Sequence, residues 1–428
     1  MKIKRRQFNE LLAGTSLISL FPFNSFADNY TGPVNWAGTS FLVPFNEIKT
    51  LMPITKSASE ISSDTDNASF FNSSLNKYLK EKPLTGINLK LEGFAENAKL
   101  ALTYGFAAEF DFGEFKDTEL QKTAYLTYSF GQCLLYDVYA RIIVSSVPVR
   151  AISTHLISYE EEKKYSNIKA ELMKRAFYNK TTPEETMVDQ FRLMVQKQSF
   201  KKKEWKGQKF RVGVVSLPDD SSDLFKNFGL TKNQFLDFLG QSSSFAFAYK
   251  LNSPILPFMM NASLTNTTIS RFDFATKLYN KIDVKLPSTN FELKIYHQGW
   301  EFVEESNQQN AKSILEVSLG MALEIKIYDT FEKKIIYNQY FFGETKYEEN
   351  KNSLMRSNAS KVCELTEGIL ERAFLSIKDK DYRKKIIEGD AFGSRLTSSF
   401  VQIDTDKPEE VRKQSELVLQ KLPQVNSF

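Results

Sequence analysis

Apolar and polar residues alternate along residues 313–328, the centre of a longer stretch, 291–342, that organises the second half of the chain. Every odd position from Leu315 to Ile327 is apolar, and the even positions between them carry Glu, Ser, Gly, Ala or Lys. A period of two predicts a strand with one buried face and one wet face, as in an antiparallel sheet. The polar residues 328–333 predict a turn, and residues 334–342 predict the returning strand.

The first half of the chain carries a similar pattern. It predicts strands at 100–112 and 123–136 and a return strand at 141–149. Ser-Phe-Gly at 129–131, followed by Tyr136-Asp137, matches Ser-Leu-Gly at 318–320, followed by Tyr328-Asp329. The two spacings differ by three residues, so a duplication requires a bulge or a longer hairpin in one copy. The alternatives are a structural duplication and a coincidence between two similar hairpins.

Helical periodicity and start signals mark the segments between and after these strands. Residues 159–178 are rich in helix formers, and Thr182-Pro183-Glu184-Glu185 is typical of a helix start. The longest predicted helix is 352–377, and a final one runs from Pro408 to Leu422. In the middle of the chain we expect a helix from Thr231 that stops at Gly240, a strand at 245–250 and a helix at 272–279.

The length of 428 residues exceeds what one core usually organises, so two domains are expected. The predicted fold class is α/β or α+β, with two tandem domains that are each a mainly antiparallel sheet with packing helices. The predicted division is a signal peptide (1–27), a first domain with trailing helices (28–200), a basic linker (201–209) and a second domain with C-terminal helices (210–428).

Composition and charge narrow the class of protein. The hydrophobic fraction of 42% with 25% charged residues is ordinary for a globular protein and excludes wholesale disorder. The net charge of +4 is too small to imply nucleic acid, and no nucleic-acid motif accompanies it. After the leader, no run approaches the roughly 20 apolar residues that a transmembrane helix needs.

The first 27 residues have the organisation of an export signal. A basic segment precedes a moderately apolar one, and Ser25-Phe26-Ala27 supplies small residues before a cleavage point at Asp28. Arg5-Arg6-Gln7-Phe8 resembles the core of a twin-arginine signal peptide, although Lys4 and Asn9-Glu10 depart from the pattern. The resemblance implies signal recognition by Arg5, Arg6 and Phe8, cleavage after Ala27, and a periplasmic location. The alternative is a Sec signal that happens to contain Arg-Arg.

The order of elements carries a second resemblance. A strand, a helix, a strand and a long hairpin with a Tyr-Asp turn are followed by a packing helix. The residues that carry this order are 323–329, 335–336 and 352–377, and residues 134–144 repeat part of it more weakly. This order resembles the small α/β domains of bacterial envelope assembly proteins, such as the curli secretion lipoprotein and the N-terminal domain of the Tol–Pal propeller protein. The likeness is one of topology, and topology does not fix function.

Residues that carry chemistry are few, and we assign no catalytic, cofactor-binding or metal-binding residue. His155 and His297 fall in different predicted domains and are both expected in solvated turns. Glu109 and Asp111 share one strand face, where a solvated pair is favoured over a cation site. Cys133 and Cys363 are expected as two buried thiols, with a disulfide as the alternative. The cluster 201–209, with Trp205 and Arg211 nearby, is expected as a charged linker, with contact to anionic lipid as the alternative.

These observations favour one class of function over another. We expect a non-enzymatic periplasmic protein that assists assembly by binding other envelope proteins, because an export signal is present and catalytic motifs are lacking. The alternative is an enzyme or small-ligand receptor whose site forms between the two domains, where pockets often occur. The oligomeric state and any specific partner stay open.

Overall fold

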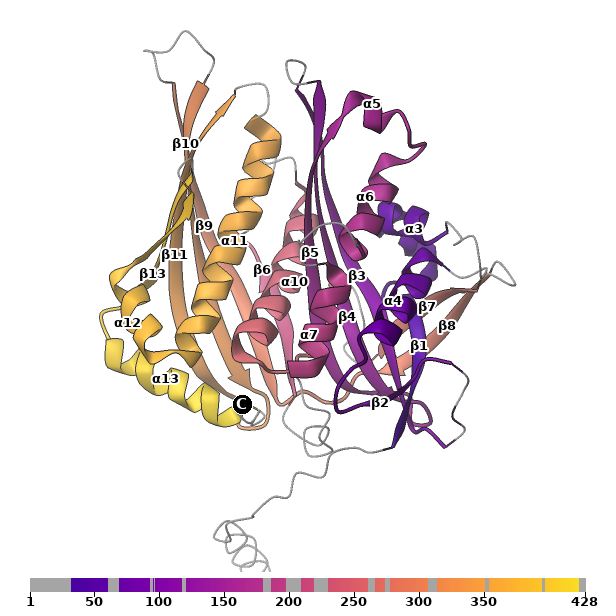
Figure 1. Cartoon of the computed structure of the whole chain (residues 1–428). Helices are drawn as coiled ribbons and strands as arrows, with labels where there is room; N and C mark the ends of the chain where they lie inside the picture. Colours follow the sequence, from indigo (N-terminus) through magenta and orange to yellow (C-terminus); the bar gives the residue numbers. More distant parts are fainter. Residues whose placement is uncertain are drawn as a thin grey trace, which may run out of the picture.

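The computed structural model shows two β-sheets with helices packed between and beside them (Figure 1). The described residues are 32–60, 69–92, 95, 97–117, 121–179, 186–197, 209–218, 230–260, 266–273, 278–306, 314–350, 354–394 and 397–422. The signal residues Arg5, Arg6, Phe8 and Ala27 therefore lie outside the described residues. Among the described helices, none combines the length and the apolar character needed to cross a membrane.

Within the described ranges, the first sheet has seven strands in the order β2-β1-β3-β4-β5-β8-β7. Its strands are β1 (Pro33–Phe41), β2 (Asn88–Lys90), β3 (Leu100–Asp117), β4 (Lys122–Asp137), β5 (Ile142–Ser158), β7 (Asn266–Asp273) and β8 (Leu278–Lys285). β3, β4 and β5 form a long antiparallel meander, and β1 runs parallel to β3. The β7–β8 hairpin joins β5 through one parallel pairing, Ile142 with Lys285, and touches β1 at Phe41.

Helices cover one face of the first sheet. They are η2 (Phe45–Glu47), α2 (Ile48–Leu51), α3 (Pro53–Ser59), α4 (Phe70–Glu81), α5 (Tyr159–Glu162), α6 (Ile168–Phe177) and α7 (Met187–Lys197). Tyr104 and Phe106 point from β3 into this layer, where they meet Phe71 of α4 and Phe177 of α6 with ring centroids 4.7–5.7 Å apart. This aromatic cluster is buried, so it anchors the helices on the sheet.

The described residues of the second sheet form six strands in the order β12-β13-β11-β10-β9-β6. Its strands are β6 (Phe210–Ser216), β9 (Phe291–Ser306), β10 (Ile314–Asp329), β11 (Lys334–Asn350), β12 (Asp390–Ser394) and β13 (Thr397–Asp404). The predicted strand at 313–328 is confirmed: Val317, Leu319, Leu323 and Ile325 are buried, and Lys326 lies on the opposite, partly wet face. β6 is parallel to β9, and all other pairs are antiparallel.

Two long helices form a layer that the sheets share. α10 (Lys232–Leu251) and α11 (Leu354–Lys378) lie between the sheets, and α12 (Lys380–Glu388) and α13 (Pro408–Lys421) pack beside the second one (Figure 1). Phe238 of α10 packs against Phe110, Tyr128 and Phe130 of the first sheet, at 5.4–5.9 Å between ring centroids. Phe247, on the same helix, packs against Phe210 of the second sheet at 5.0 Å. The predicted fold class of two sheets with packing helices is confirmed.

The two halves of the chain share the same order and direction of strands. In one half β1 runs parallel to β3 and leads, through helices, to the meander β3–β4–β5; in the other β6 runs parallel to β9 and leads to β9–β10–β11. Three irregularities in pairing fall at matching places: after Trp36 in β1 and Val212 in β6, at Phe106/Ala108 in β3 and opposite Ala322/Leu323 in β9, and before Tyr136 in β4 and Tyr328 in β10. A further irregularity, at Asp111/Glu114 in β3, has no counterpart in the described pairing of β9. The matching bulges at three strand pairs favour a structural duplication over two merely similar hairpins.

The details of the predicted duplication need one correction. Both hairpins have the same single bulge and the same loop length, since Asp137 pairs with Ile142 and Asp329 with Lys334. The expected bulge or longer hairpin in only one copy is therefore wrong. Gly131 lies five residues before its Tyr and Gly320 lies eight before its own, so the Ser-Xaa-Gly match is not between equivalent positions. The Tyr-Asp match, in contrast, is between equivalent positions of the two hairpins.

Three local predictions in the middle of the chain also differ from the structure. α10 continues through Gly240 and through the predicted strand 245–250. A Cβ at Gly240 would lie 2.1–2.5 Å from ring atoms of Phe258, so this glycine permits close packing and does not end the helix. The predicted helix 272–279 is wrong at both of its described ends, because residues 272–273 end β7 and residues 278–279 begin β8. These two strands follow the predicted linker 201–209 and yet pair within the first sheet. The linker itself, at 201–208, lies outside the described residues.

Candidate functional site: the outer edge of β5 and the ion pairs behind it

β5 has one edge paired with β4 and one edge turned outward. In an antiparallel ladder, alternate residues direct both backbone groups away from the partner strand. The Arg150 N–H donates to Gln190 Oε1 at 3.0 Å, and the Ser146 carbonyl accepts from the Ile255 N–H at 3.1 Å. The backbone N–H and C=O groups of the even-numbered residues of β5 therefore point away from β4. Within the described part of the chain, no strand pairs with this edge beyond Ile142.

The equivalent edge in the other half of the chain is occupied. β13 pairs with β11 from Tyr340 to Tyr347. Because the two hairpins are related by 192 positions, the equivalent residues of β5 are Pro148 to His155. Among the described residues, no strand covers these positions of β5, although Gln190 of α7 already occupies the Arg150 N–H.

Apolar side chains accompany this outer edge. Ile152 and Leu156 are 45% and 54% exposed, and Thr154 between them is exposed as well. An uncovered strand edge with exposed apolar side chains readily accepts another strand.

A pocket of about 290 Å³ lies on the other side of β5, between the strand and helices α6 and α7. β5 contributes Ala151, Ser153 and His155, and the helices contribute Arg175 of α6 and Gln190 of α7. None of its described lining residues is acidic. Burial opposes the charge of Arg175, but its hydrogen bonds to Glu161 and Tyr165 outweigh this and raise its pKa. The described lining of the pocket therefore combines small and polar side chains with His155 and two arginines, Arg150 and Arg175.

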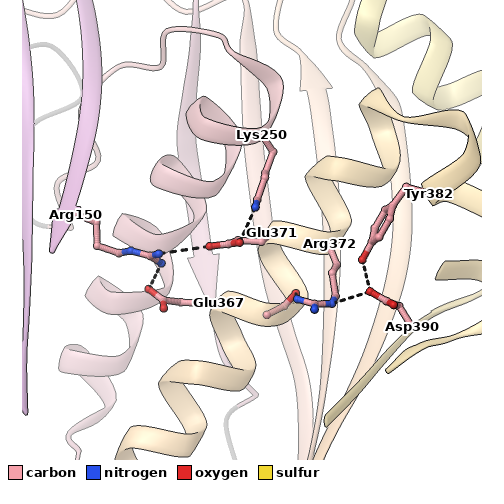
Figure 2. Close-up of polar contacts among 8 residues, drawn as sticks. Arg150, Lys250, Glu367, Glu371, Arg372, Tyr382 and Asp390 are labelled. Atoms are coloured by element: carbon pink, nitrogen blue, oxygen red, sulfur yellow. Dashed lines mark hydrogen bonds and ion pairs between the residues drawn. The ribbon is translucent and has the colours of Figure 1, made fainter. Parts of the chain in front are cut away.

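Behind the edge, the Arg150 side chain points into the shared helical layer (Figure 2). Its Nη1 lies 2.6 Å from Glu367 Oε1 and its Nη2 lies 3.4 Å from Glu371 Oε1, both on α11. Lys250 of α10 completes the group, with Nζ 2.7 Å from Glu371 Oε2. The guanidinium also lies 4.3 Å from the ring centroid of Phe245. Two cations and two carboxylates thus join β5 to both helices of the shared layer.

The pKa values of this group follow from its burial. Desolvation raises the pKa of Glu367 to about 7, although the neighbouring Arg150 opposes the shift. Burial also opposes the charge of Arg150, but the attraction of Glu367 and Glu371 is stronger and raises its pKa. Breaking such a buried pair by removing one partner typically costs 3–5 kcal/mol, roughly, because the other charge stays buried. The network therefore holds β5 of the first sheet to the two helices of the shared layer.

A second set of polar contacts continues from α11 to the last strands. Arg372 Nε lies 3.1 Å from Asp390 Oδ2, and Tyr382 Oη donates to the same oxygen at 2.5 Å (Figure 2). Burial of Asp390 is outweighed by hydrogen bonds from Lys385 and Tyr382, so the pKa of Asp390 is lowered. This carboxylate stays ionised and ties α11, α12 and β12 together.

Both histidines lie within strands, so the expectation of solvated turns is wrong. His155 is in β5 and lines the pocket. His297 is in β9 and only 3% exposed, with its ring centroid 4.1 Å from that of Trp300 and 5.9 Å from that of Phe235. Burial lowers the pKa of His297 to about 3, so this side chain is neutral at ordinary pH. The strand pattern of each segment continues through its histidine, and this pattern is the sequence signal that places both histidines within strands.

The acidic pair and the cysteines have structural surroundings. Glu109 accepts hydrogen bonds from the Ile54 and Thr55 N–H groups at the start of α3, whereas Asp111 pairs with Lys169 of α6 at 2.6 Å. The described residues contain no cluster of three or more His, Cys, Asp or Glu side chains able to hold a metal ion. Cys133 and Cys363 are both buried free thiols, in core clusters on opposite faces of the first sheet, as favoured from the sequence.

Sequence reasoning did not find Arg150, Glu367 or Gln190. One signal was available: Glu367 falls inside the apolar stripe of the long helix, close to Val362 and Ile369. Nothing in the sequence pairs it with Arg150, which lies more than 200 positions away.

The described part of the basic cluster makes internal contacts. The Lys209 Nζ donates to the Val144 carbonyl at 2.6 Å, and the nearby Arg211 pairs with Glu292.

Comparisons with known proteins found no match among protein-family models, curated proteins or solved structures.

Proposed function

We propose that this is an exported periplasmic protein that binds other envelope proteins, and that the outer edge of β5 is where a partner attaches. One observation carries the proposal: the edge that β13 covers in the second sheet has no added strand in the first, within the described part of the chain. A partner segment in extended conformation adds there as a strand, antiparallel to β5, through the outward backbone groups of Ile152 and Thr154.

The surroundings of the edge define the chemistry of that segment. Residues that alternate along an added strand point to opposite faces. On one face they cover Ile152 and Leu156, so they are apolar. On the other face one side chain enters the pocket beside Ser153, Arg175 and Gln190. Since no described carboxylate lines this pocket, an acidic or amide side chain fits it best.

A non-enzymatic role agrees with the state of the charged groups. The charges of Arg150 and Lys250 balance those of Glu367 and Glu371 in ion pairs inside the core. A buried, paired network of this kind holds structural elements together.

The second candidate function, an enzyme or small-ligand receptor, receives support from the pocket alone. Its volume of about 290 Å³ is at the lower limit for sites that enclose a small molecule, roughly 300–1,000 Å³. It also lies within the first sheet-and-helix unit, whereas α10 and α11 fill the layer between the sheets. One side chain of a bound strand matches this pocket better than a free ligand does.

Site-specific crosslinking in intact cells tests the proposal. A photoreactive amino acid at Ile152 is expected to capture envelope proteins, whereas the same group at Lys77, exposed on α4, is not. Thr154→Pro removes an outward N–H that β4 does not use, so the fold tolerates it while an added strand does not. The proposal is wrong if Thr154→Pro leaves the crosslinks at residue 152 undiminished.

Export is tested separately. Mass spectrometry of the mature protein should find Asp28 at its N-terminus, and a variant with both Arg5→Lys and Arg6→Lys should lose export.

A further inference from the structure

The most exposed large apolar side chains of the described residues lie at the tips of the two equivalent hairpins. Tyr139 is 70% exposed and Phe331 is 87% exposed. They stand 192 positions apart, at the same place in the two turns. Each has an exposed isoleucine nearby: Ile142 (37%) in the first hairpin and Ile335 (51%) in the second. The aromatic tip is thus a feature of both halves of the duplication.

The backbone of each tip is held firmly. Asp137 Oδ1 accepts hydrogen bonds from the N–H groups of Tyr139 and Ala140 at 2.9 and 2.8 Å. Asp329 Oδ1 does the same for Phe331 and Glu332 at 3.0 and 2.9 Å. Such Asx-type turns fix the loop, so the aromatic rings are presented in water with little loop ordering left to occur on binding.

The two tips lie on one edge of the molecule. The Lys285 N–H donates to the Arg141 carbonyl at 2.6 Å, and the Thr330 N–H donates to the Asn290 carbonyl at 2.8 Å. Lys285 and Asn290 are five residues apart, and five residues of extended chain span at most about 18 Å. The tips are therefore close enough to touch one surface together.

The charge around the tips is mainly positive. Arg141, Lys285, Lys333 and Lys334 are exposed there, and the exposed acids among the described residues nearby are Glu332, which pairs with Lys334, and Asp283 on β8. Asp137 and Asp329 are used within the turns, and Asp329 is buried. Aromatic side chains at protruding points, with isoleucine and cations beside them, match the boundary between lipid headgroups and acyl chains. Anionic headgroups attract the adjacent lysines and arginines.

We propose that the two hairpin tips, 138–142 and 330–335, form a docking surface for an anionic lipid bilayer. Tyr139 and Phe331 insert at the headgroup boundary, and Arg141 and Lys333 contact lipid phosphates. A protein groove is the less favoured partner, because the tips are convex and separated. The surface is distinct from the β5 edge, and the inference stands without the proposed protein-binding role.

Co-sedimentation with vesicles tests this proposal. The full chain is used as matched variants, so that any contribution of residues 1–27 is the same in all of them. We expect binding to vesicles of phosphatidylglycerol and phosphatidylethanolamine, weakened by salt and much reduced on vesicles of phosphatidylcholine. Tyr139→Ser with Phe331→Ser should weaken binding at least tenfold, whereas Leu51→Ser, at an exposed position of α2, should not change it.

Two further variants separate charge from insertion. Arg141→Asn with Lys333→Asn keeps residues that tolerate positive φ and should remove the preference for anionic lipid. A tryptophan at residue 331 should shift its emission to the blue on vesicles, and one at the exposed residue 51 should not. Equal binding of the double-serine variant and the unaltered chain overturns the proposal. Capture of a protein at residues 139 and 331 without vesicle binding also overturns it, in favour of a protein partner.

Discussion

Arg141 and Lys333 occupy the same left-handed backbone conformation, with φ of 51° and 52°, at the same position of two hairpins 192 residues apart. Each is the last residue of a four-residue loop closed by the Asp of a Tyr-Asp pair. Residues other than Gly, Asn and Asp rarely adopt this conformation. Its recurrence at both sites reflects the turn geometry that the two Asp side chains impose.

This geometry predicts how the second turn responds to substitution. Lys333→Gly should be neutral or should raise the free energy of unfolding by up to about 1 kcal/mol, because glycine adopts positive φ without strain. Lys333→Val should lower it by about 1–2 kcal/mol, because a β-branched side chain is poorly accommodated there. Urea unfolding measures both. A loss of stability with glycine comparable to that with valine would contradict the proposed role of the turn.

The central strand of the second sheet predicts a contrast between neighbouring positions. Leu323 is fully buried, so Leu323→Asp should destabilise the protein by roughly 3 kcal/mol or more. Lys326 lies on the other face, but its Nζ is 2.7 Å from Glu324 Oε1, and Glu324 is itself buried. Lys326→Glu should therefore cost about 1–2 kcal/mol, more than the half kcal/mol expected for a simply solvated lysine.

Thermal melts compare these two variants with Lys346→Gln, an exposed position on β11. Lys346→Gln should change the free energy of unfolding by about 0.5 kcal/mol or less. If Lys326→Glu were more damaging than Leu323→Asp, the register of β10 would be shifted by one residue.

The buried ion-pair network predicts a specific dependence of stability on pH. The pKa of Glu367 is about 7 in the folded protein, against an ordinary value of 4.5. The folded state therefore holds this proton more tightly than the unfolded state does. As the pH rises from 4.5 to 7, Glu367 should lower the free energy of unfolding, by at most about 1.4 kcal/mol per pH unit.

Glu367→Gln should remove this part of the pH dependence. Glu388→Gln, at an exposed position of α12, should leave it in place. Denaturant unfolding between pH 4.5 and 7.5 provides the comparison. Parallel curves for the unaltered protein and Glu367→Gln would show that Glu367 does not titrate in this window.

The shared helical layer predicts that the two halves unfold together. A protease should cut first within residues 201–209, because exposed lysine-rich segments are preferred sites. The two fragments should nevertheless stay associated, since β7 and β8 pair within the first sheet and Phe238 packs into it. Phe238→Ala should cost about 3–5 kcal/mol and weaken this association. Gel filtration after cleavage checks the result, and separate elution of the fragments would contradict it.

The sequence alone determined which faces of individual elements are buried. The alternation at 313–328 predicted both the buried Leu323 and the partly wet Lys326, because a strand exposes alternate residues whatever it packs against. The Tyr-Asp pairs predicted the equivalent turns, because an Asp side chain caps a turn through its nearest neighbours. The paired sheets and the long helix after the second hairpin followed from the same local periodicities.

The tertiary structure decided which elements meet. Phe-Ala-Phe-Ala-Tyr at 245–249 alternates as a strand does, yet it lies in α10, which is buried between two sheets and needs apolar residues on both sides. Likewise β7 and β8 return to the first sheet, and Arg150 meets Glu367 across more than 200 residues. The outer edge of β5 and the proximity of the two tips arise in the same way. A local period records which side of an element avoids water, but it carries no information about the distant segment that covers that side.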